Sequence, residues 1–315
     1  MIKAELVPQL ATCCAICGST DFEPVCHSRA TRILWLKTPI SICKSCGFVY
    51  VNPTWTQDQY DKVMDLWYPY KFVWDPPDDQ DLEKRHVKWR KMDERISSYY
   101  PNGIKCLLDV GAGQGWCIEY LKNKYPDLKA CAIERWEACQ RHIEQKYDGT
   151  IVGDEILGDW SLEHEASFDL IVFRHTLEHI LEPKKVLKKV RRFLSDDGYA
   201  YIVVPSLREL TRLLIIDSFR PCHVSYFCKE TLDSLARQVG LEAVVLEEKG
   251  QGELWGLFRR GNAEFFKPNV YREMKDIISS TRKKERYRSF QHLLKIEALN
   301  TLQGLKLYKP LSNKY

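Results

Sequence analysis

The chain has 315 residues, of which 44% are hydrophobic and 29% are charged. This length and composition are typical of a globular protein with one substantial core and one or two small additions. No apolar run approaches the roughly 20 residues that cross a bilayer, and residues 1–11 lack the apolar stretch of a signal peptide. The sequence therefore argues against a membrane-spanning or secreted protein and predicts a cytoplasmic one.

The net charge of +4 is distributed unevenly along the chain. Residues 259–315 contain 14 Lys and Arg residues against 5 Asp and Glu residues, which gives this tail a net charge of +9. Such a tail is suited to phosphates, to an anionic membrane surface or to a partner. A solvated helical face explains the same pattern equally well, so both interpretations stay open.

Composition divides the chain into four regions. Residues 1–53 carry paired cysteines, and residues 54–102 form an aromatic, charged and partly helical linker. Residues 103–260 alternate short apolar runs with helical patterns, and residues 261–315 are predicted to form a basic helical extension. We expect the third region to be the main domain.

Seven apolar runs in the third region predict β-strands, at residues 104–110, 128–133, 150–152, 168–173, 199–204, 241–247 and 253–259. Apolar residues at helical spacing predict helices between them, at residues 116–125, 136–147, 186–194 and 230–239. Strands alternating with helices indicate an α/β fold whose mostly parallel sheet is covered on both faces. We predict a doubly wound, Rossmann-like sheet of seven strands, with the last two strands antiparallel.

The loop after the first predicted strand runs from Asp109 to Gly115 and contains Gly111 and Gly113. Glycines there allow sharp turns and a close approach of the backbone to a ligand, and the next helix offers N–H groups at its N-terminus. The G-x-G-x-G spacing lacks the longer loop of dinucleotide enzymes, which favours a nucleoside without a pyrophosphate. We assign Asp109 and the three glycines to a cofactor site.

Two carboxylates follow the next two strands. Glu134 ends the second strand, about twenty residues beyond the glycine loop, where a carboxylate can accept hydrogen bonds from both ribose hydroxyls. Asp154 follows the third strand, where a side chain can meet an adenine amino group. The adjacent Glu155 is an alternative for that role.

Together with further motifs, this loop resembles that of the class I S-adenosylmethionine-dependent methyltransferases. The resemblance covers residues 103–260 and includes the strand at 168–173, the segment His175–Pro183, the strand at 198–205 and the segment His223–Phe227. It implies S-adenosylmethionine as the cofactor and assigns Arg174, which follows the fourth strand, to its site. It does not identify the acceptor.

Two Cys-x-x-Cys-Gly motifs, 25 residues apart, place Cys14, Cys17, Cys43 and Cys46 in the N-terminal region. Each motif directs two thiolates at one ion, and four thiolates form the closed tetrahedral site typical of structural zinc. We therefore predict a small zinc ribbon. Alternative ligands are Cys13, Cys26 and His27.

A zinc ribbon followed by residues 48–53 resembles the N-terminal module of a methyltransferase subgroup that includes deoxysugar C-methyltransferases. Those enzymes carry a further C-terminal domain, whereas this chain ends about 55 residues after its last predicted strand. The resemblance implies a sugar acceptor, and the difference favours methylation of oxygen or nitrogen over carbon.

Four polar residues are candidate catalytic groups. His175, Glu178 and His179 follow the fourth strand, at the edge where open α/β sheets bind ligands, and His223 follows the fifth strand. Methyl transfer to a hydroxyl requires removal of its proton, and histidine is the natural base near neutral pH. We expect one histidine to be the base and Glu178 to orient a histidine or bind the acceptor; capping or packing explains each histidine as well.

Three aromatic residues of the linker, Tyr68, Tyr70 and Trp74, are candidates for a lid over the methyl donor, because aromatic faces attract a cation. Packing of the linker onto the main domain is the alternative.

The resulting hypothesis is a methyltransferase acting by in-line displacement on a small molecule, with a sugar or glycan hydroxyl as the expected acceptor. An RNA methyltransferase is the second hypothesis, motivated by the zinc ribbon and the basic tail. A non-catalytic partner subunit that keeps the fold is the third. The sequence predicts no oligomeric state.

Overall fold

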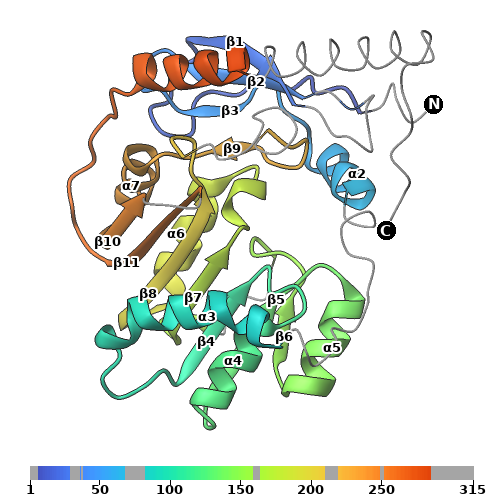
Figure 1. The fold of residues 1–315 in the computed structure, drawn as a ribbon, viewed down its shortest axis with the longest axis vertical. Coiled ribbons are helices and arrows are strands. Elements are labelled where there is room, and N and C mark those ends of the chain that lie inside the picture. Colours follow the sequence, from blue (N-terminus) through green and yellow to red (C-terminus); the bar gives the residue numbers. More distant parts are fainter. Residues whose placement is uncertain are drawn as a thin grey trace, which may run out of the picture.

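The computed structural model describes residues 6–28, 36, 38–67, 82–158, 164–209, 219–248 and 252–284. Its centre is a seven-stranded sheet in the order β10-β11-β8-β7-β4-β5-β6 (Figure 1). The strands are β4 (Cys106–Val110), β5 (Lys129–Ile133), β6 (Thr150–Gly153), β7 (Phe168–Arg174), β8 (Leu194–Pro205), β10 (Leu241–Glu248) and β11 (Glu253–Arg260). Neighbours from β6 to β8 pair parallel, whereas β11 is antiparallel to both β8 and β10. The predicted seven-stranded, mostly parallel sheet is confirmed.

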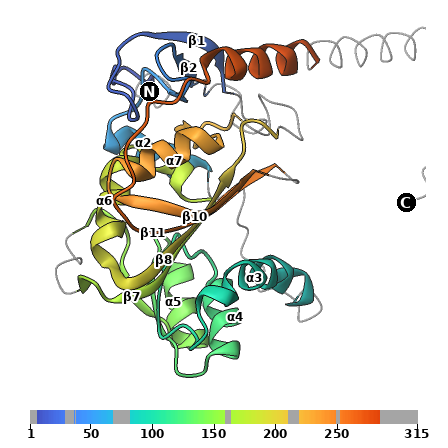
Figure 2. The same cartoon turned by 90° about the vertical axis from the view of Figure 1, so that its left-hand side faces the viewer.

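Helices cover both faces of this sheet (Figure 2). On one face lie α3 (Leu82–Ile96), α4 (Trp116–Lys124) and α5 (Glu137–Tyr147), and on the other lie α6 (Pro183–Phe193) and α7 (Lys229–Arg237). The helix α6 shows why these segments fold in this way. Its buried residues Val186, Leu187, Val190 and Phe193 recur at helical spacing, and Pro183 occupies the first turn.

A second sheet, of four strands in the order β1-β2-β3-β9, lies across the carboxyl end of the main sheet (Figure 1). The N-terminal region supplies β1 (Phe22–His27), β2 (Pro39–Cys43) and β3 (Val49–Val51). The fourth strand, β9 (Ser225–Tyr226), comes from the connection between β8 and α7 and pairs antiparallel with β3. The helix α2 (Gln57–Trp67) follows β3 along the chain. The N-terminal region and the main domain therefore share one sheet.

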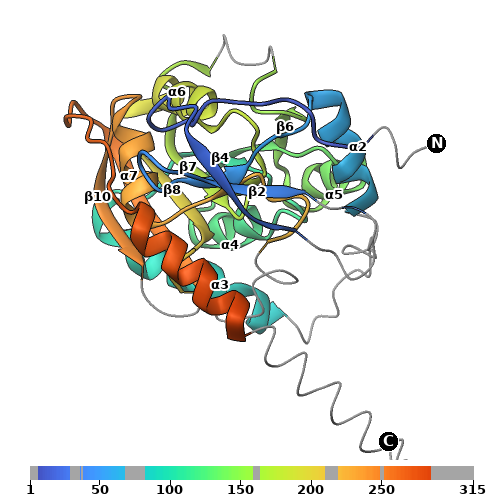
Figure 3. The same cartoon turned by 90° about the horizontal axis from the view of Figure 1, so that it is seen from above.

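A helix over residues 271–284 packs on this second sheet (Figures 1 and 3). Its Met274 and Ile278 are buried in the same apolar cluster as Ile40 of β2, and Lys275 Nζ lies 2.7 Å from a carboxylate oxygen of Glu23. This helix belongs to the predicted basic tail, and residues 285–315 lie outside the described part of the chain. None of the helices in the described ranges combines the length and the apolar character that crossing a bilayer demands.

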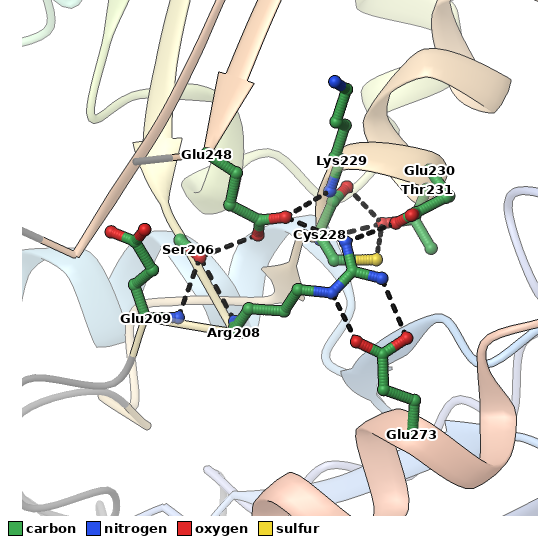
Figure 4. Close-up of polar contacts among 9 residues, drawn as sticks. All are labelled: Ser206, Arg208, Glu209, Cys228, Lys229, Glu230, Thr231, Glu248 and Glu273. Carbon is green, nitrogen blue, oxygen red and sulfur yellow. Dashed lines mark hydrogen bonds and ion pairs between the residues drawn. The ribbon is translucent and has the colours of Figure 1, made fainter. Parts of the chain in front are cut away.

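The guanidinium of Arg208, just beyond β8, binds carboxylates from three other elements of the molecule (Figure 4). Its Nη1 lies 2.6 Å from Glu230 at the start of α7 and 2.9 Å from Glu248 at the end of β10, while Nε and Nη2 bind both carboxylate oxygens of Glu273, at 2.6 and 2.9 Å. The Ser206 hydroxyl donates to Glu248 at 2.7 Å. We call this group the Arg208 clasp, since it ties the 271–284 helix to the main domain.

Candidate functional site

The order of the main sheet reverses between β4 and β7, and the connections from these two strands diverge at their carboxyl ends. Open α/β sheets bind ligands at such a point. A cavity of about 190 Å³ lies there, beneath α2. Five of the predicted site residues line it: Gly111, Glu134, Asp154, His175 and His179.

The three glycines of the loop after β4, Gly111, Gly113 and Gly115, have different structural roles. All have positive φ, and a Cβ at Gly111 would lie 2.6 Å from the Thr176 hydroxyl, which itself donates to the Val110 carbonyl. At Gly115 a Cβ would press on Ile143 of α5, at 2.7 Å. Only Gly113 faces open space. Gly111 and Gly115 therefore let the loop pack against its neighbours, whereas Gly113 keeps space beside the cavity.

Glu134 is held in a fixed orientation at the end of β5. Its carboxylate accepts hydrogen bonds from the Gly113 N–H at 2.7 Å and from the Trp136 N–H at 2.9 Å, and only 5% of the residue is exposed. Burial raises its pKa, and the backbone donors partly offset that effect. Asp109 is also buried, outside the cavity lining; burial and then the charge of Glu134 raise its pKa to about 7.

Asp154 and Glu155 both line the cavity just beyond β6 and both are exposed to solvent. The geometry of the cavity therefore does not separate these two candidates for the adenine contact.

His175 follows β7 with a left-handed φ of 56°. Its Nε2 lies 3.1 Å from Glu253 and its Nδ1 lies 3.4 Å from Glu178, so a carboxylate faces each ring nitrogen. Burial lowers the pKa of His175, but the bonds to Glu178 and Glu253 outweigh it and raise the pKa above its ordinary value. Arg174 binds the same Glu253 at 2.8 Å and does not line the cavity. The pair of carboxylates favours a protonated His175, which is poorly suited to accept a proton.

His179 presents a different arrangement. Its Nδ1 lies 2.9 Å from the Cys222 carbonyl oxygen, which only accepts, so Nδ1 carries the proton of the neutral ring and Nε2 becomes the acceptor nitrogen. The ring of His223 packs edge-on against that of His179, with 4.7 Å between the centroids. Glu178, which is 1% exposed, follows Leu177 in the same turn. The structure thus brings the four candidate catalytic residues together, and two of them, His175 and His179, line the cavity, whereas Glu178 and His223 lie behind them outside its lining.

The helix α2 supplies cavity residues that the sequence did not reveal: Gln57, Tyr60, Asp61 and Met64. Arg135, directly after Glu134, anchors this helix through bonds to Asp61 at 2.6 Å and to Asp65 at 3.2 Å. Asp61 and Asp65 lie one turn apart on α2, and this spacing could have indicated that the helix binds a cation. Nothing in the sequence indicated that the cation is Arg135. The proposed lid residues Tyr68, Tyr70 and Trp74 lie outside the described residues.

The four cysteines of the two paired motifs converge in the N-terminal region. Sγ of Cys14 lies 3.5 Å from that of Cys46, Sγ of Cys17 lies 3.5 Å from that of Cys43, and all four lie within 4.8 Å of one another. Thiolates about 2.3 Å from one zinc ion stand about 3.8 Å apart in a tetrahedron. The donor set and its spacing are therefore compatible with a zinc site.

The alternative ligands lie elsewhere. Cys13 is exposed, and Cys26 is buried in the apolar cluster between β1 and the 271–284 helix. Neither residue, nor His27, belongs to the four-cysteine group. The twelve cysteines, all within the described ranges, form no disulfide.

Comparison with curated proteins finds methyltransferases. The chain is 32% identical over 126 residues to a malonyl-[acyl-carrier protein] O-methyltransferase of Neorickettsia risticii, covering 38% of this chain and 46% of that protein. It is 28% identical over 158 residues to the biotin biosynthesis bifunctional protein BioHC of Teredinibacter turnerae, covering 45% of this chain and 27% of that protein. The chain thus spans less than half of the length of these relatives.

Solved structures show the same fold. A 1,6-didemethyltoxoflavin-N1-methyltransferase of Burkholderia thailandensis superimposes with a TM-score of 0.51 at 17% identity, covering 68% of this chain and 96% of that one. Residues 82–246, more than half of the chain, match a family described as a methyltransferase domain. The chain therefore belongs to the methyltransferase domain family, and its α/β domain is that of an S-adenosylmethionine-dependent methyltransferase.

Proposed function

We propose that this protein transfers a methyl group from S-adenosylmethionine to a small molecule, and that the acceptor atom is a hydroxyl of a sugar or glycan intermediate. One observation carries the proposal: a single cavity is lined both by the glycine loop with Glu134 and by His179. A methyl donor bound at Glu134 and the proton-accepting His179 can therefore both reach an acceptor molecule that binds in the same cavity.

We assign residues of the cavity to the methyl donor according to the chemistry of their side chains. Glu134, already oriented by two backbone N–H groups, receives the ribose hydroxyls, and Asp154 receives the adenine amino group. Gly113 leaves space for the donor beside the loop. Asp109 is buried in β4, just before the loop, and Arg174 acts through Glu253 on the neighbouring His175. The methyl-bearing sulfonium is already activated, so it needs positioning more than chemical help.

The acceptor half holds the base. In our proposal the acceptor oxygen gives its proton to Nε2 of His179 as it attacks the methyl carbon in line with the departing sulfur. The carbonyl of Cys222 keeps Nδ1 protonated, and the edge-on ring of His223 restrains the imidazole. Glu178 holds His175 beside this centre and favours the positive charge that develops on His179.

The acceptor class draws on the relatives and on the N-terminal region. Proteins named for small-molecule acceptors support a small acceptor: a (S)-tetrahydroprotoberberine N-methyltransferase of Eschscholzia californica, 27% identical over 100 residues, and the 1,6-didemethyltoxoflavin-N1-methyltransferase. The sugar assignment draws on the resemblance of the cysteine motifs to the sugar methyltransferase subgroup. In this proposal Cys14, Cys17, Cys43 and Cys46 hold one structural zinc ion in a protein that works in the reducing cytoplasm.

No structural observation favours the two alternative functions. In the basic tail, the described helix over residues 271–284 packs on the second sheet, where Lys275 pairs with Glu23 and Arg282 bonds to the Val25 carbonyl. The cations that motivate RNA binding are thus partly engaged within the protein. A non-catalytic subunit needs neither the oriented Glu134 nor the histidine pair.

Transfer of a labelled methyl group tests the acceptor class. The purified protein is incubated with methyl-labelled S-adenosylmethionine and, in separate reactions, with a mixture of nucleotide-linked sugars or with total RNA. We expect label in the sugar fraction, abolished in His179→Gln and retained in His164→Gln. Label that enters only RNA establishes the second hypothesis, and a protein that transfers no label and binds no donor fits the third.

A further inference from the structure

One backbone carbonyl links the helix α2, which lines the donor cavity, to the candidate base. The Cys222 oxygen accepts a hydrogen bond from the Tyr60 hydroxyl at 2.6 Å and another from Nδ1 of His179 at 2.9 Å. Tyr60 is 5% exposed and Cys222 is fully buried, so water competes little for this carbonyl. The two side chains, 119 positions apart in the sequence, therefore share one acceptor.

The segment that carries this carbonyl is held from several sides. The N–H of His223 donates to the Arg220 carbonyl at 3.0 Å, and the N–H of Val224 donates to the Glu178 carbonyl at 2.8 Å. The N–H of Val51, in β3, donates to the Val224 carbonyl at 2.9 Å. These bonds fix the path of the segment, and the Tyr60 hydroxyl occupies one of the two acceptor directions of the Cys222 oxygen.

Tyr60 belongs to the helix that covers the donor cavity. Its helical neighbours Gln57, Asp61 and Met64 line the same cavity, and Arg135 anchors α2 beside Glu134. The Tyr60 ring also packs against Trp55, with 5.8 Å between the ring centroids, so loss of the hydroxyl alone leaves the ring supported.

We propose that Tyr60 is a positioning residue for the methyl transfer, which sets the orientation and the basicity of His179 through the shared carbonyl of Cys222. The inference rests on the proposed role of His179 as the base. Two donors to one oxygen weaken each other, because each draws electron density from it. The Tyr60 hydroxyl therefore reduces the stabilisation that the carbonyl gives to a protonated His179 and keeps the imidazole available as a base.

Other titratable groups surround His179, and all of them are still present when Tyr60 is replaced by phenylalanine. Glu178 lies on its own turn, and Cys222 and His223 lie on the segment opposite. The same cavity is lined by further ionisable residues: Asp61, Glu134, Asp154, Glu155, His175 and Glu182. Comparison of Tyr60→Phe with the wild type cancels these contributions, since none of the groups is altered.

The test needs no acceptor molecule. Protein labelled with ¹⁵N-histidine is titrated by NMR, and the resonances of His179 are assigned by their loss in His179→Gln. We expect the midpoint of the His179 titration to move to higher pH in Tyr60→Phe. The matched control is Tyr100→Phe, which loses a tyrosine-to-carbonyl bond of 3.0 Å to Asp169, and in which His179 should titrate as in the wild type.

An unchanged or lowered midpoint in Tyr60→Phe overturns the inference. Binding of S-adenosylhomocysteine, measured on the same samples by calorimetry, separates this failure from that of the proposed function. A Tyr60→Phe protein that binds the ligand but leaves His179 unchanged contradicts only the role of Tyr60. Absence of binding in the wild type contradicts the donor site itself.

Discussion

Glu134 places its carboxyl group where only 5% of the residue meets solvent, and two backbone N–H groups donate hydrogen bonds to it there. Replacing it by alanine removes the ribose acceptor and leaves the Gly113 N–H without its present partner. We expect Glu134→Ala to weaken S-adenosylhomocysteine binding by about 1–3 kcal/mol, measured by calorimetry. Glu137→Ala, in the exposed first turn of α5, should bind as the wild type does. Equal affinity of the two variants for S-adenosylhomocysteine would show that Glu134 does not contribute to the binding site.

Glu253 makes a pH-dependent contribution to stability. The bond to His175 and the charge of Arg174 outweigh burial and lower the pKa of Glu253 from 4.5 to about 2. This contribution is present above pH 4.5 and is lost as the pH falls towards 2. The pKa of His175 is raised, so its contribution is complete below about pH 6.5 and is lost as the pH rises through the raised value.

Glu253→Gln should therefore cost most stability between about pH 4.5 and 6.5. Urea unfolding of the wild type and the variant across the pH range measures the difference. The difference in the free energy of unfolding between wild type and variant should shrink at pH values below and above that window. A difference in the free energy of unfolding that stays constant with pH would show that the Glu253 side chain stabilises the protein by packing instead of by charge.

The residues of the glycine loop and Glu134 could be predicted because spacing relative to a strand decides their location. Tyr60 could not be singled out in this way. It is one of several aromatic residues in the linker, and its partner Cys222 lies on an irregular segment that no periodic pattern describes. Its place in the site follows from the tertiary packing of α2, which local sequence does not encode.

At the scale of elements, the two cysteine turns are built alike. In each, the N–H of the glycine after the second cysteine donates to the carbonyl of the first cysteine, at 2.9 Å for Gly18 and 2.8 Å for Gly47. We expect metal analysis of the purified protein to find about one zinc ion per chain. Cys43→Ser should lose this zinc and unfold more easily, because β2 and β3 on either side of the turn belong to the sheet that holds β9.

The control for that experiment is Cys13→Ser, an exposed cysteine next to the motif that should leave both zinc content and stability unchanged. A metal-free wild type that is nevertheless fully folded would contradict the zinc assignment.

Helices and strands of the main domain were predicted to within a few residues at most ends, because their apolar periodicity reflects burial on the sheet. The largest difference is β8, which begins at Leu194, before the apolar run at residues 199–204. The pairing of β9 with β3 was not predicted, since two residues of strand leave no periodic signal and their partner lies far away in the sequence. This pairing is one of several contacts that join the N-terminal region to the main domain, together with a shared apolar cluster that includes Ile16 and Phe48.

At the scale of the whole molecule, the Arg208 clasp joins carboxylates from α7, β10 and the 271–284 helix through one cation (Figure 4). Removing the arginine leaves Glu230, Glu248 and Glu273 close together without their cation. Breaking a partly buried network of this kind costs about 2–4 kcal/mol. We expect Arg208→Ala to lower the free energy of unfolding by about that amount in urea titrations.

Arg259→Ala is the matched control, since Arg259 is 54% exposed and pairs with one carboxylate, Glu242. Exposed pairs contribute about 0–1 kcal/mol, so this variant should unfold close to the wild type. Equal losses in the two variants would show that the clasp contributes no more than a surface ion pair.

The central claim is that the crevice between β4 and β7, closed from above by α2, holds the adenosyl group of the methyl donor. A crystal structure of the protein grown with S-adenosylhomocysteine tests it most directly. We predict that the ligand lies in the cavity, with its ribose hydroxyls on Glu134, its adenine at Asp154 or Glu155 and its sulfur facing His179. A ligand bound elsewhere, or a cavity that instead takes a nicotinamide dinucleotide, would contradict the account.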